Sequence, residues 1–106
     1  MKIVTIQTTC KNKKEAKNIA TKLIKDKLAA CVQISKIKSV YSWNDKINCE
    51  KEFKLNIKTK KELFEIVKNR ILKLHSYSLP EIIEIDISDA SIDYIEYICN
   101  NTREEK

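Results

Sequence analysis

Hydrophobic and polar residues alternate in some stretches of the chain and recur at helical spacing in others, which predicts a mixed α and β protein. Residues 2–8 alternate with a period of two, and this pattern predicts a first strand. A helix is expected next, because apolar residues recur at helical spacing from Ala16 to Leu28. Its predicted start is at Asn12, since Asn12 and Glu15 have the spacing of a capping box.

A long β-hairpin is predicted after this helix. Residues 30–43 form the second strand, and the alternation slips at residues 35–37, where we expect a β-bulge. Asn44 and Asp45 are the expected turn, because both tolerate a positive φ better than most residues. The return strand ends in clean alternation, and its inward-pointing side chains are Phe53, Leu55 and Ile57.

The second half of the chain begins with another predicted helix. Thr59 and Glu62 have the spacing of a capping box and predict where it starts. Its apolar face carries Leu63, Val67, Ile71 and Leu74. A loop over residues 75–79 follows, and Pro80 favours extended chain before it.

A strand and a helix complete the pattern. The alternating residues Ile83, Ile85 and Ile87 predict a fourth strand. Ser91 is expected to cap a last helix, whose inward face carries Ile92, Ile95 and Ile98. Residues 100–106 are expected to form a frayed, charged tail.

The order β-α-β-β-α-β-α predicts an α+β fold, a ferredoxin-like βαββαβ sandwich with a C-terminal helix. The length suits one domain over residues 1–106. The hairpin is unusually extended, since fourteen residues of strand would span ~45 Å. Exposed strand edges invite pairing with another chain, and leaving Tyr41 and Trp43 bare would be costly. We therefore expect a ring of identical subunits, each covering its neighbour's hairpin.

Composition indicates a soluble, globular protein, with 42% hydrophobic and 34% charged residues. A cytoplasmic location is expected because no signal-peptide pattern is recognised. No stretch approaches the ~20 apolar residues of a membrane span, and no signal-peptide core follows the first residues. The net charge of +6 comes almost wholly from lysine, with Arg70 and Arg103 as the only arginines. Binding to nucleic acid or to a membrane is therefore not expected.

Several chemistries are excluded by missing residue types. The chain has no glycine, so it lacks the phosphate-binding loops of nucleotide-binding proteins, and no organic cofactor is expected. Its four cysteines form no Cys-x-x-Cys pair, which argues against a structural zinc and, in a reducing compartment, against a disulfide framework.

Catalysis and RNA recognition are not expected either. Acylphosphatases share this size and topology, but residues 8–12 lack the arginine and glycine that such an enzyme needs. A nucleophile pair of Cys10 and His75 lacks an identifiable third group or oxyanion donor. RNA-recognition sheets need glycines and several aromatic residues on the third strand, where this chain offers only Phe53.

Five sequence blocks, in this order, resemble the CutA divalent-cation tolerance family: LAACV at 28–32, SVYSWNDKI at 39–47, LNIKT at 55–59, HSYSLPEII at 75–83 and DYIEYI at 93–98. The resemblance extends over residues 3–98, nearly the whole chain. It implies the ferredoxin-like fold and a compact homotrimer. The function it implies is divalent-cation (copper) tolerance, by a non-catalytic metal-binding or signalling module that responds to metal ions.

Cys10 and His75 are the candidate metal ligands. His75 is the only histidine and follows a predicted helix end, where its alternative role is to complete the helix dipole. Cys10 is expected in the loop after the first strand, where Lys11 and Lys13 would lower its thiol pKa; its alternative role is an ordinary core thiol. Thiolate and imidazole suit copper better than magnesium or calcium. The resemblance also implies copper or another divalent cation, because some bacterial relatives hold copper at a matching cysteine and at two adjacent histidines. Of these two histidines, His75 matches the second, and Leu74 replaces the first.

Five aromatic residues are candidates for lining a ligand-binding cleft between subunits: Tyr41, Trp43, Tyr77, Tyr94 and Tyr97. Lys58 and Glu81 would add charge to this cleft. Packing at a subunit interface is the other explanation, since tyrosine and tryptophan are enriched there. The cleft favours an alternative function, a PII-like trimeric sensor of a small ligand, in which the metal plays no part.

Overall fold

The computed structural model describes residues 2–105, and within them the helices and strands follow in the predicted order. The elements are β1 Ile3–Cys10, α1 Lys13–Lys25, β2 Cys31–Trp43, β3 Lys46–Lys60, the 3-10 turn η1 Lys61–Leu63, α2 Phe64–Leu74, β4 Ile83–Asp86 and α3 Ile92–Asn100. The strands form a four-stranded antiparallel sheet in the order β2-β3-β1-β4. The predicted mixed fold, built on such a sheet, is confirmed.

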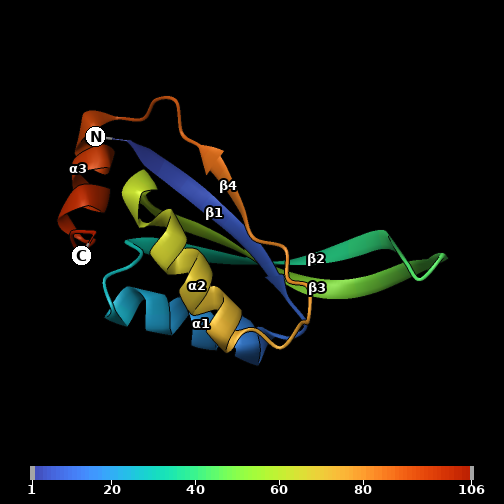
Figure 1. Cartoon of the computed structure of the whole chain (residues 1–106). Coiled ribbons are helices and arrows are strands. Elements are labelled where there is room, and N and C mark those ends of the chain that lie inside the picture. The colour runs from blue at the N-terminus through green and yellow to red at the C-terminus, as the bar shows by residue number, and fades with distance from the viewer. Residues whose placement is uncertain (1, 106) are drawn as a thin grey trace.

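The core lies between the sheet and two helices. Helices α1 and α2 cover one face of the sheet, whereas α3 lies at the end of the sheet, beside the N-terminus (Figure 1). The side chains buried in this core include Val4, Ile6, Ile19, Leu23, Leu55, Ile57, Val67 and Ile71. These are the positions that alternation and helical spacing marked as apolar, so the sequence pattern also orients β1, α1, β3 and α2 correctly. None of the helices within residues 2–105 combines the length and apolarity needed to cross a bilayer.

The hairpin of β2 and β3 projects from this body (Figure 1), and the longest dimension of the molecule is 44 Å. At its tip Asn44 and Asp45 have φ angles of 51° and 61°. Two consecutive positive φ values are typical of the tight turn that suits the twist of a β-hairpin. The predicted turn is therefore confirmed, and it sets Trp43 opposite Lys46.

The predicted bulge at residues 35–37 is wrong. Strands β2 and β3 pair without interruption from Cys31 opposite Lys58 to Trp43 opposite Lys46. The alternation slips for a different reason, because every residue of β2 is exposed or half-buried. With no core to face, these positions are not constrained to alternate.

The start of α1 is confirmed at its cap. The Oδ1 atom of Asn12 accepts a 2.8 Å hydrogen bond from the backbone N–H of Glu15. The reciprocal half of the capping box is not formed, because the Glu15 side chain accepts from the backbone N–H of Ser76 instead. The helix ends at Lys25, earlier than predicted, and Leu28 is buried beyond the following turn.

The predicted capping box of Thr59 and Glu62 is wrong. Thr59 is still part of β3, and its hydroxyl donates a 2.7 Å hydrogen bond to the carbonyl of Leu28. The chain enters α2 through the turn η1, and no side chain caps Phe64, the first residue of α2. The local pattern assigned the Thr59 hydroxyl to the helix cap, but this hydroxyl bonds instead to a residue 31 positions away in the chain.

The last helix differs from its prediction in orientation. Ser91 is its cap residue, but its side chain makes no capping hydrogen bond. Ile98 is fully buried and Ile95 is half-buried, whereas Ile92 is 75% exposed, so its predicted inward position is wrong. Six residues turn a helix by ~600°, which leaves Ile92 about 120° away from Ile98 around the axis.

The predicted frayed tail is wrong at its beginning. Thr102 is buried, and the backbone N–H of Arg103 donates a 2.8 Å hydrogen bond to the carbonyl of Lys27. The ammonium of Lys60 donates to the carbonyls of Thr102 and Arg103, at 3.4 and 3.2 Å. Lys106 lies outside the described residues.

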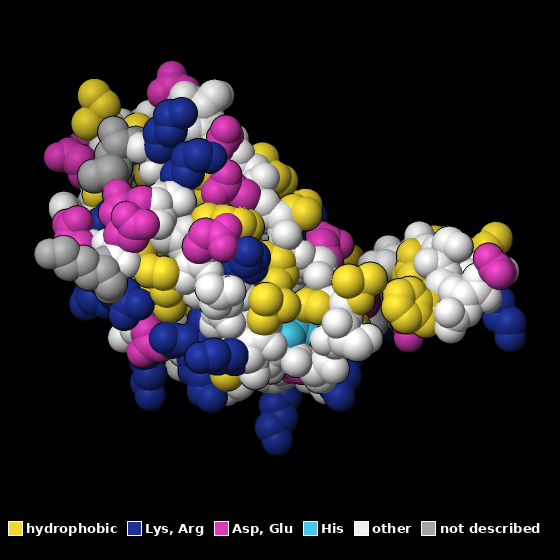
Figure 2. Space-filling view, in the orientation of Figure 1, with side chains coloured by type: hydrophobic (Ala, Val, Ile, Leu, Met, Phe, Trp, Pro, Cys, Tyr) yellow, Lys and Arg dark blue, Asp and Glu magenta, His cyan; other side chains and the backbone are white. Residues whose placement is uncertain are grey.

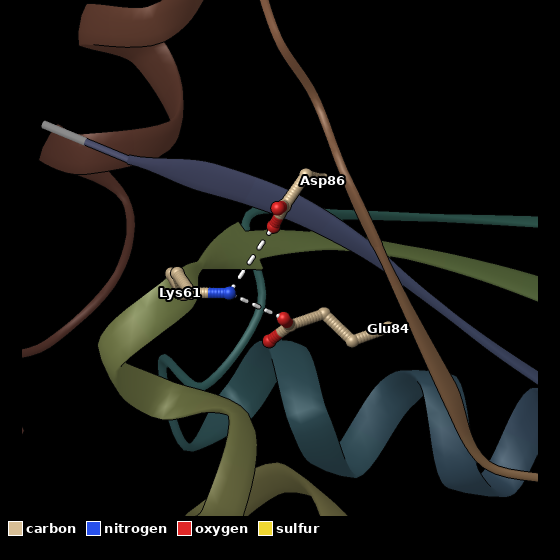
Figure 3. A network of polar contacts seen from close by, with 3 residues as sticks. All are labelled: Lys61, Glu84 and Asp86. Carbon is tan, nitrogen blue, oxygen red and sulfur yellow. Dashed lines mark hydrogen bonds and ion pairs between the residues drawn. The ribbon is translucent and has the colours of Figure 1, made fainter.

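Two ion pairs join the edge strand β4 to Lys61, the first residue of the turn η1 before α2. The ammonium of Lys61 lies 2.6 Å from a carboxylate oxygen of Glu84 and 3.1 Å from one of Asp86 (Figure 3). Both carboxylates raise the pKa of Lys61, chiefly through these hydrogen bonds. Strand β4 ends before Ile87, which packs against a second buried cluster formed by Ile3, Ala30 and Ile98.

Candidate functional site

Three side chains with metal-binding atoms meet where β1, α1 and α2 come together. Cys10 is the last residue of β1, Glu15 lies in the first turn of α1, and His75 follows α2. One ligand atom from each residue lies within 4.8 Å of the other two. The predicted pair Cys10 and His75 is therefore brought together, and Glu15 joins it. We refer to these residues as the Cys10–Glu15–His75 cluster.

Both ring nitrogens of His75 have hydrogen-bond partners. Its Nδ1 atom accepts a 3.1 Å hydrogen bond from the backbone N–H of Tyr77. Its Nε2 atom lies 2.7 Å from the carbonyl oxygen of Thr9. Because Nδ1 accepts, Nε2 carries the proton and donates it to this carbonyl. A metal ion that binds the ring must replace one of these two contacts.

The thiol of Cys10 is protonated at neutral pH. Cys10 belongs to β1, not to the loop predicted for it, and it is fully buried. Burial, and after it the negative charges of Glu15 and Glu52, together raise the thiol pKa of Cys10 to about 12. The predicted lowering by Lys11 and Lys13 is wrong, because both lysines are exposed and water screens their charges.

Glu15 has one carboxylate oxygen free. Its Oε2 atom accepts a 3.1 Å hydrogen bond from the backbone N–H of Ser76. Its Oε1 atom is buried, and no donor among residues 2–105 contacts it. A buried acceptor without a partner is unfavourable. A cation held beside Cys10 and His75 would satisfy it.

A second feature lies between the outer half of the hairpin and the loop after α2. A cavity of about 350 Å³ is lined by Tyr41, Trp43, Glu50, Glu52, Tyr77, Ser78 and Leu79, which we call the hairpin cleft. Figure 2 shows hydrophobic side chains gathered on the hairpin and on the neighbouring part of the body. Of the predicted cleft residues, the structure brings together Tyr41, Trp43 and Tyr77.

Two tyrosine hydroxyls in the hairpin cleft bond to carboxylates. The hydroxyl of Tyr41 donates to Glu50, and that of Tyr77 donates to Oε2 of Glu52 at 2.8 Å. Burial and then this hydrogen bond raise the pKa of Tyr77, whereas the bond to Glu50 is the main cause that raises the pKa of Tyr41. The ring of Tyr77 also lies 4.9 Å from that of His75. Tyr77 therefore borders both the cleft and the metal-binding cluster.

The other predicted cleft residues lie elsewhere in the chain. Lys58 donates a 2.8 Å hydrogen bond to Gln33, and Glu81 is exposed in the loop before β4. Tyr94 and Tyr97 stack on α3 with ring centroids 5.7 Å apart, and the hydroxyl of Tyr97 donates to the carbonyl of Ala30. Their predicted place in one cleft with Tyr41 requires a neighbouring subunit.

Glu50 and Glu52 were not predicted from the sequence as site residues. In the observed register Glu50 pairs with Ser39 and Glu52 with Ile37. Directly opposite residues share a face, so both carboxylates lie on the face of the hairpin that carries Tyr41 and Trp43. The tight turn fixes this register, so the two glutamates could have been placed from the turn and the alternation alone.

Comparisons with known proteins agree on one family. The family model of the CutA1 divalent ion tolerance protein matches residues 4–101. The divalent-cation tolerance protein CutA of Pyrococcus horikoshii is 33% identical over 101 residues, which cover 95% of this chain and 99% of that protein. The chloroplastic protein CutA 1 of Oryza sativa is 36% identical, and the match covers 95% of this chain and 58% of that protein.

Solved structures give the same result. The crystal structure of CutA1 from Oryza sativa superposes with a TM-score of 0.95 at 35% identity, covering 98% of this chain and 96% of that one. The structure of the periplasmic divalent cation tolerance protein CutA from Archaeoglobus fulgidus gives a TM-score of 0.92 at 35% identity, over 93% and 97% of the two chains. Fold, length and sequence agree, and the chain belongs to the CutA1 family of divalent ion tolerance proteins.

Proposed function

We propose that this chain acts in divalent-cation tolerance as a non-catalytic metal-binding module, and that Cys10, Glu15 and His75 hold the metal. The observation that carries the proposal is the position of three metal-binding atoms within 4.8 Å, together with the unpartnered buried oxygen Oε1 of Glu15. The family name describes tolerance of divalent ions, which fits such a site.

Copper is the proposed ion. A thiolate and an imidazole are soft or borderline ligands, which favour copper over magnesium and calcium. Binding must displace the proton of the Cys10 thiol, and a metal with high affinity for thiolate is needed to do so. It must also replace one hydrogen bond of His75, either to the carbonyl of Thr9 or to the N–H of Tyr77.

The same contacts support a non-catalytic role. A nucleophilic cysteine needs a lowered pKa or an adjacent base that accepts its proton. The pKa of Cys10 is raised instead, and the proton on Nε2 of His75 is donated to the carbonyl of Thr9. We infer a binding or signalling role in the response to metal ions.

The assembly we propose is a homotrimer of single-domain, ferredoxin-like subunits in the cytoplasm. The hairpin leaves Val40 and Ile47 exposed at 67% and 85%, and neighbouring copies would cover them. Cys49 is an exposed free thiol, which suits a reducing compartment. Light scattering on the purified chain tests the subunit number.

The hairpin cleft supports a second function, that of a PII-like sensor of a small ligand. Its volume of about 350 Å³ lies in the range of small-molecule sites. Three aromatic rings and two carboxylates converge on it, which gives both an apolar surface and polar groups for orientation. Tyr77 lies between this cleft and His75, so the two candidate sites share one side chain.

Calorimetric titration of the reduced protein with Cu(I) and Cu(II) tests the metal-binding function. The wild type is compared with a variant carrying Cys10→Ala and His75→Ala, and with Cys49→Ala as the matched control. The control removes an exposed thiol on the hairpin that is outside the cluster. Saturable binding that is lost only in the double variant supports the proposal. Binding that all three proteins share overturns it.

A further inference from the structure

The hairpin cleft holds a carboxylate that is buried without a cation. Glu52 is 8% exposed, and its one hydrogen bond with a residue in the range 2–105 comes from the hydroxyl of Tyr77 to Oε2. Neither Glu50 nor Glu52 takes part in the ion pairs formed by residues 2–105. A buried carboxylate is stable only when it is paired or well hydrogen-bonded. The cleft therefore favours a positively charged occupant.

The chain's own lysines do not fill this role. Lys54 and Lys46 lie on the same face of β3 as the two glutamates, since they are separated from them by even numbers of residues. Neither of them forms an ion pair with Glu50 or Glu52 in the described part of the chain. The two carboxylates are therefore available to pair with a positively charged ligand.

The lining of the cleft indicates what kind of cation fits. Tyr41, Trp43 and Tyr77 provide aromatic surfaces, which attract cations through their ring faces and also bind alkyl groups. A bare metal ion gains little from such a lining, because it needs several oxygen, nitrogen or sulfur ligands. An organic cation fits both the carboxylates and the aromatic rings of this lining. Its charged group pairs with the carboxylates, and its carbon atoms pack against the rings.

We propose that the hairpin cleft binds a small organic cation of the alkylammonium class, with Glu52 and Glu50 holding the charge and Tyr41, Trp43 and Tyr77 enclosing the alkyl groups. This inference rests on the second of the two proposed functions, the small-ligand sensor, and gives that sensor a ligand class. It is independent of metal binding at the Cys10–Glu15–His75 cluster.

The test is a titration with choline and putrescine, each followed by calorimetry and by the fluorescence of Trp43, the only tryptophan of the chain. The neutral isostere of choline, 3,3-dimethylbutan-1-ol, is titrated in parallel. At least one of the two cations is expected to saturate the cleft. The isostere is expected to bind about tenfold more weakly than choline, because it lacks the charge.

Variants assign the binding to the cleft. Glu52→Gln is expected to weaken binding of the cation about tenfold, because it removes the charge but keeps the side-chain shape. Glu96→Gln is the matched control, since Glu96 is an exposed glutamate on α3. Trp43→Leu, at a half-exposed position, removes one ring without touching the core and provides a second variant for calorimetry.

Three results would overturn the inference. Equal binding of choline and its isostere would show that the cleft binds a ligand without recognising its positive charge. This result would overturn the inference but would agree with the sensor function. Equal affinity in Glu52→Gln and Glu96→Gln would place the cation elsewhere. No binding of choline or putrescine would overturn the inference but not the sensor function, which does not depend on the ligand being a cation.

Discussion

The hydroxyl of Tyr77 donates a 2.8 Å hydrogen bond to Glu52, and this contact joins the loop after α2 to the base of the projecting hairpin. The ring of Tyr77 lies at the same time 4.9 Å from that of His75. One side chain thus borders both candidate sites. Removal of the Tyr77 side chain is therefore expected to disturb the packing of both the hairpin and the metal-binding cluster.

Replacing Tyr77 with phenylalanine tests the contact with Glu52. We expect the free energy of unfolding to fall by about 1–3 kcal/mol, because the buried carboxylate loses its donor. Urea denaturation followed by circular dichroism measures this change. In a Glu52→Leu background the same replacement should cost much less, and an equal cost in both backgrounds would show that the two residues are not coupled.

The cap of α1 gives a second prediction. Asn12→Ala should lower the free energy of unfolding by about 1 kcal/mol, because it removes the side-chain acceptor for the N–H of Glu15. Asn18→Ala is the matched control, since Asn18 is exposed in the interior of the same helix and makes no cap. Urea denaturation measures both variants. Equal effects of the two replacements would contradict a specific role for Asn12.

The four cysteines should differ in their rates of alkylation. Cys49 is exposed and should react first with iodoacetamide, whereas Cys10 is buried, has a raised pKa and should react last. Mass spectrometry of timed samples identifies the modified residues. In urea the rates should converge. Rapid modification of Cys10 in the folded protein would mean that its thiol is activated, which would reopen a catalytic role.

Copper affinity should depend on pH with a defined sign. The pKa of Cys10 is about 12, so at lower pH the thiol carries a proton that the metal must displace. Apparent affinity should therefore rise about tenfold per pH unit between roughly pH 7.5 and 9. Competition with a chelator of known affinity measures the slope. Residual binding to Cys10→Ala should lack this dependence, and a flat profile in the wild type would exclude the thiolate as a ligand.

In the metal-free protein, the raised pKa of Cys10 makes folding stability fall as the pH rises, whereas copper affinity increases with pH. Folding raises the thiol pKa from 9.0 to about 12, so the protonated form is favoured in the folded state. This contribution to stability is fully present below about pH 9 and is lost as the pH rises toward 12. The difference in unfolding free energy between the wild type and Cys10→Ala should therefore shrink in alkaline solution.

Features set by neighbouring residues could be predicted from the sequence. The cap at Asn12 and the turn at Asn44 and Asp45 act within a few residues, and both were found where expected. The order of strands and helices followed from the period of the apolar positions.

Features set by distant contacts could not be predicted in this way. Thr59 bonds to the carbonyl of Leu28 in a neighbouring part of the fold, so its spacing from Glu62 was misleading. Glu15 was assigned to a helix cap, but Ser76 binds its carboxylate and Cys10 lies beside it. The raised pKa of Cys10 likewise follows from burial, which its lysine neighbours in the sequence do not indicate.

X-ray absorption at the copper edge tests most directly whether Cys10, Glu15 and His75 hold the metal. The protein loaded with one equivalent of copper should show sulfur together with nitrogen or oxygen in the first coordination shell. The sulfur contribution should vanish in Cys10→Ala and persist in Cys49→Ala. A shell of nitrogen and oxygen alone in the wild type, or sulfur that is lost with Cys49, would contradict the proposed site.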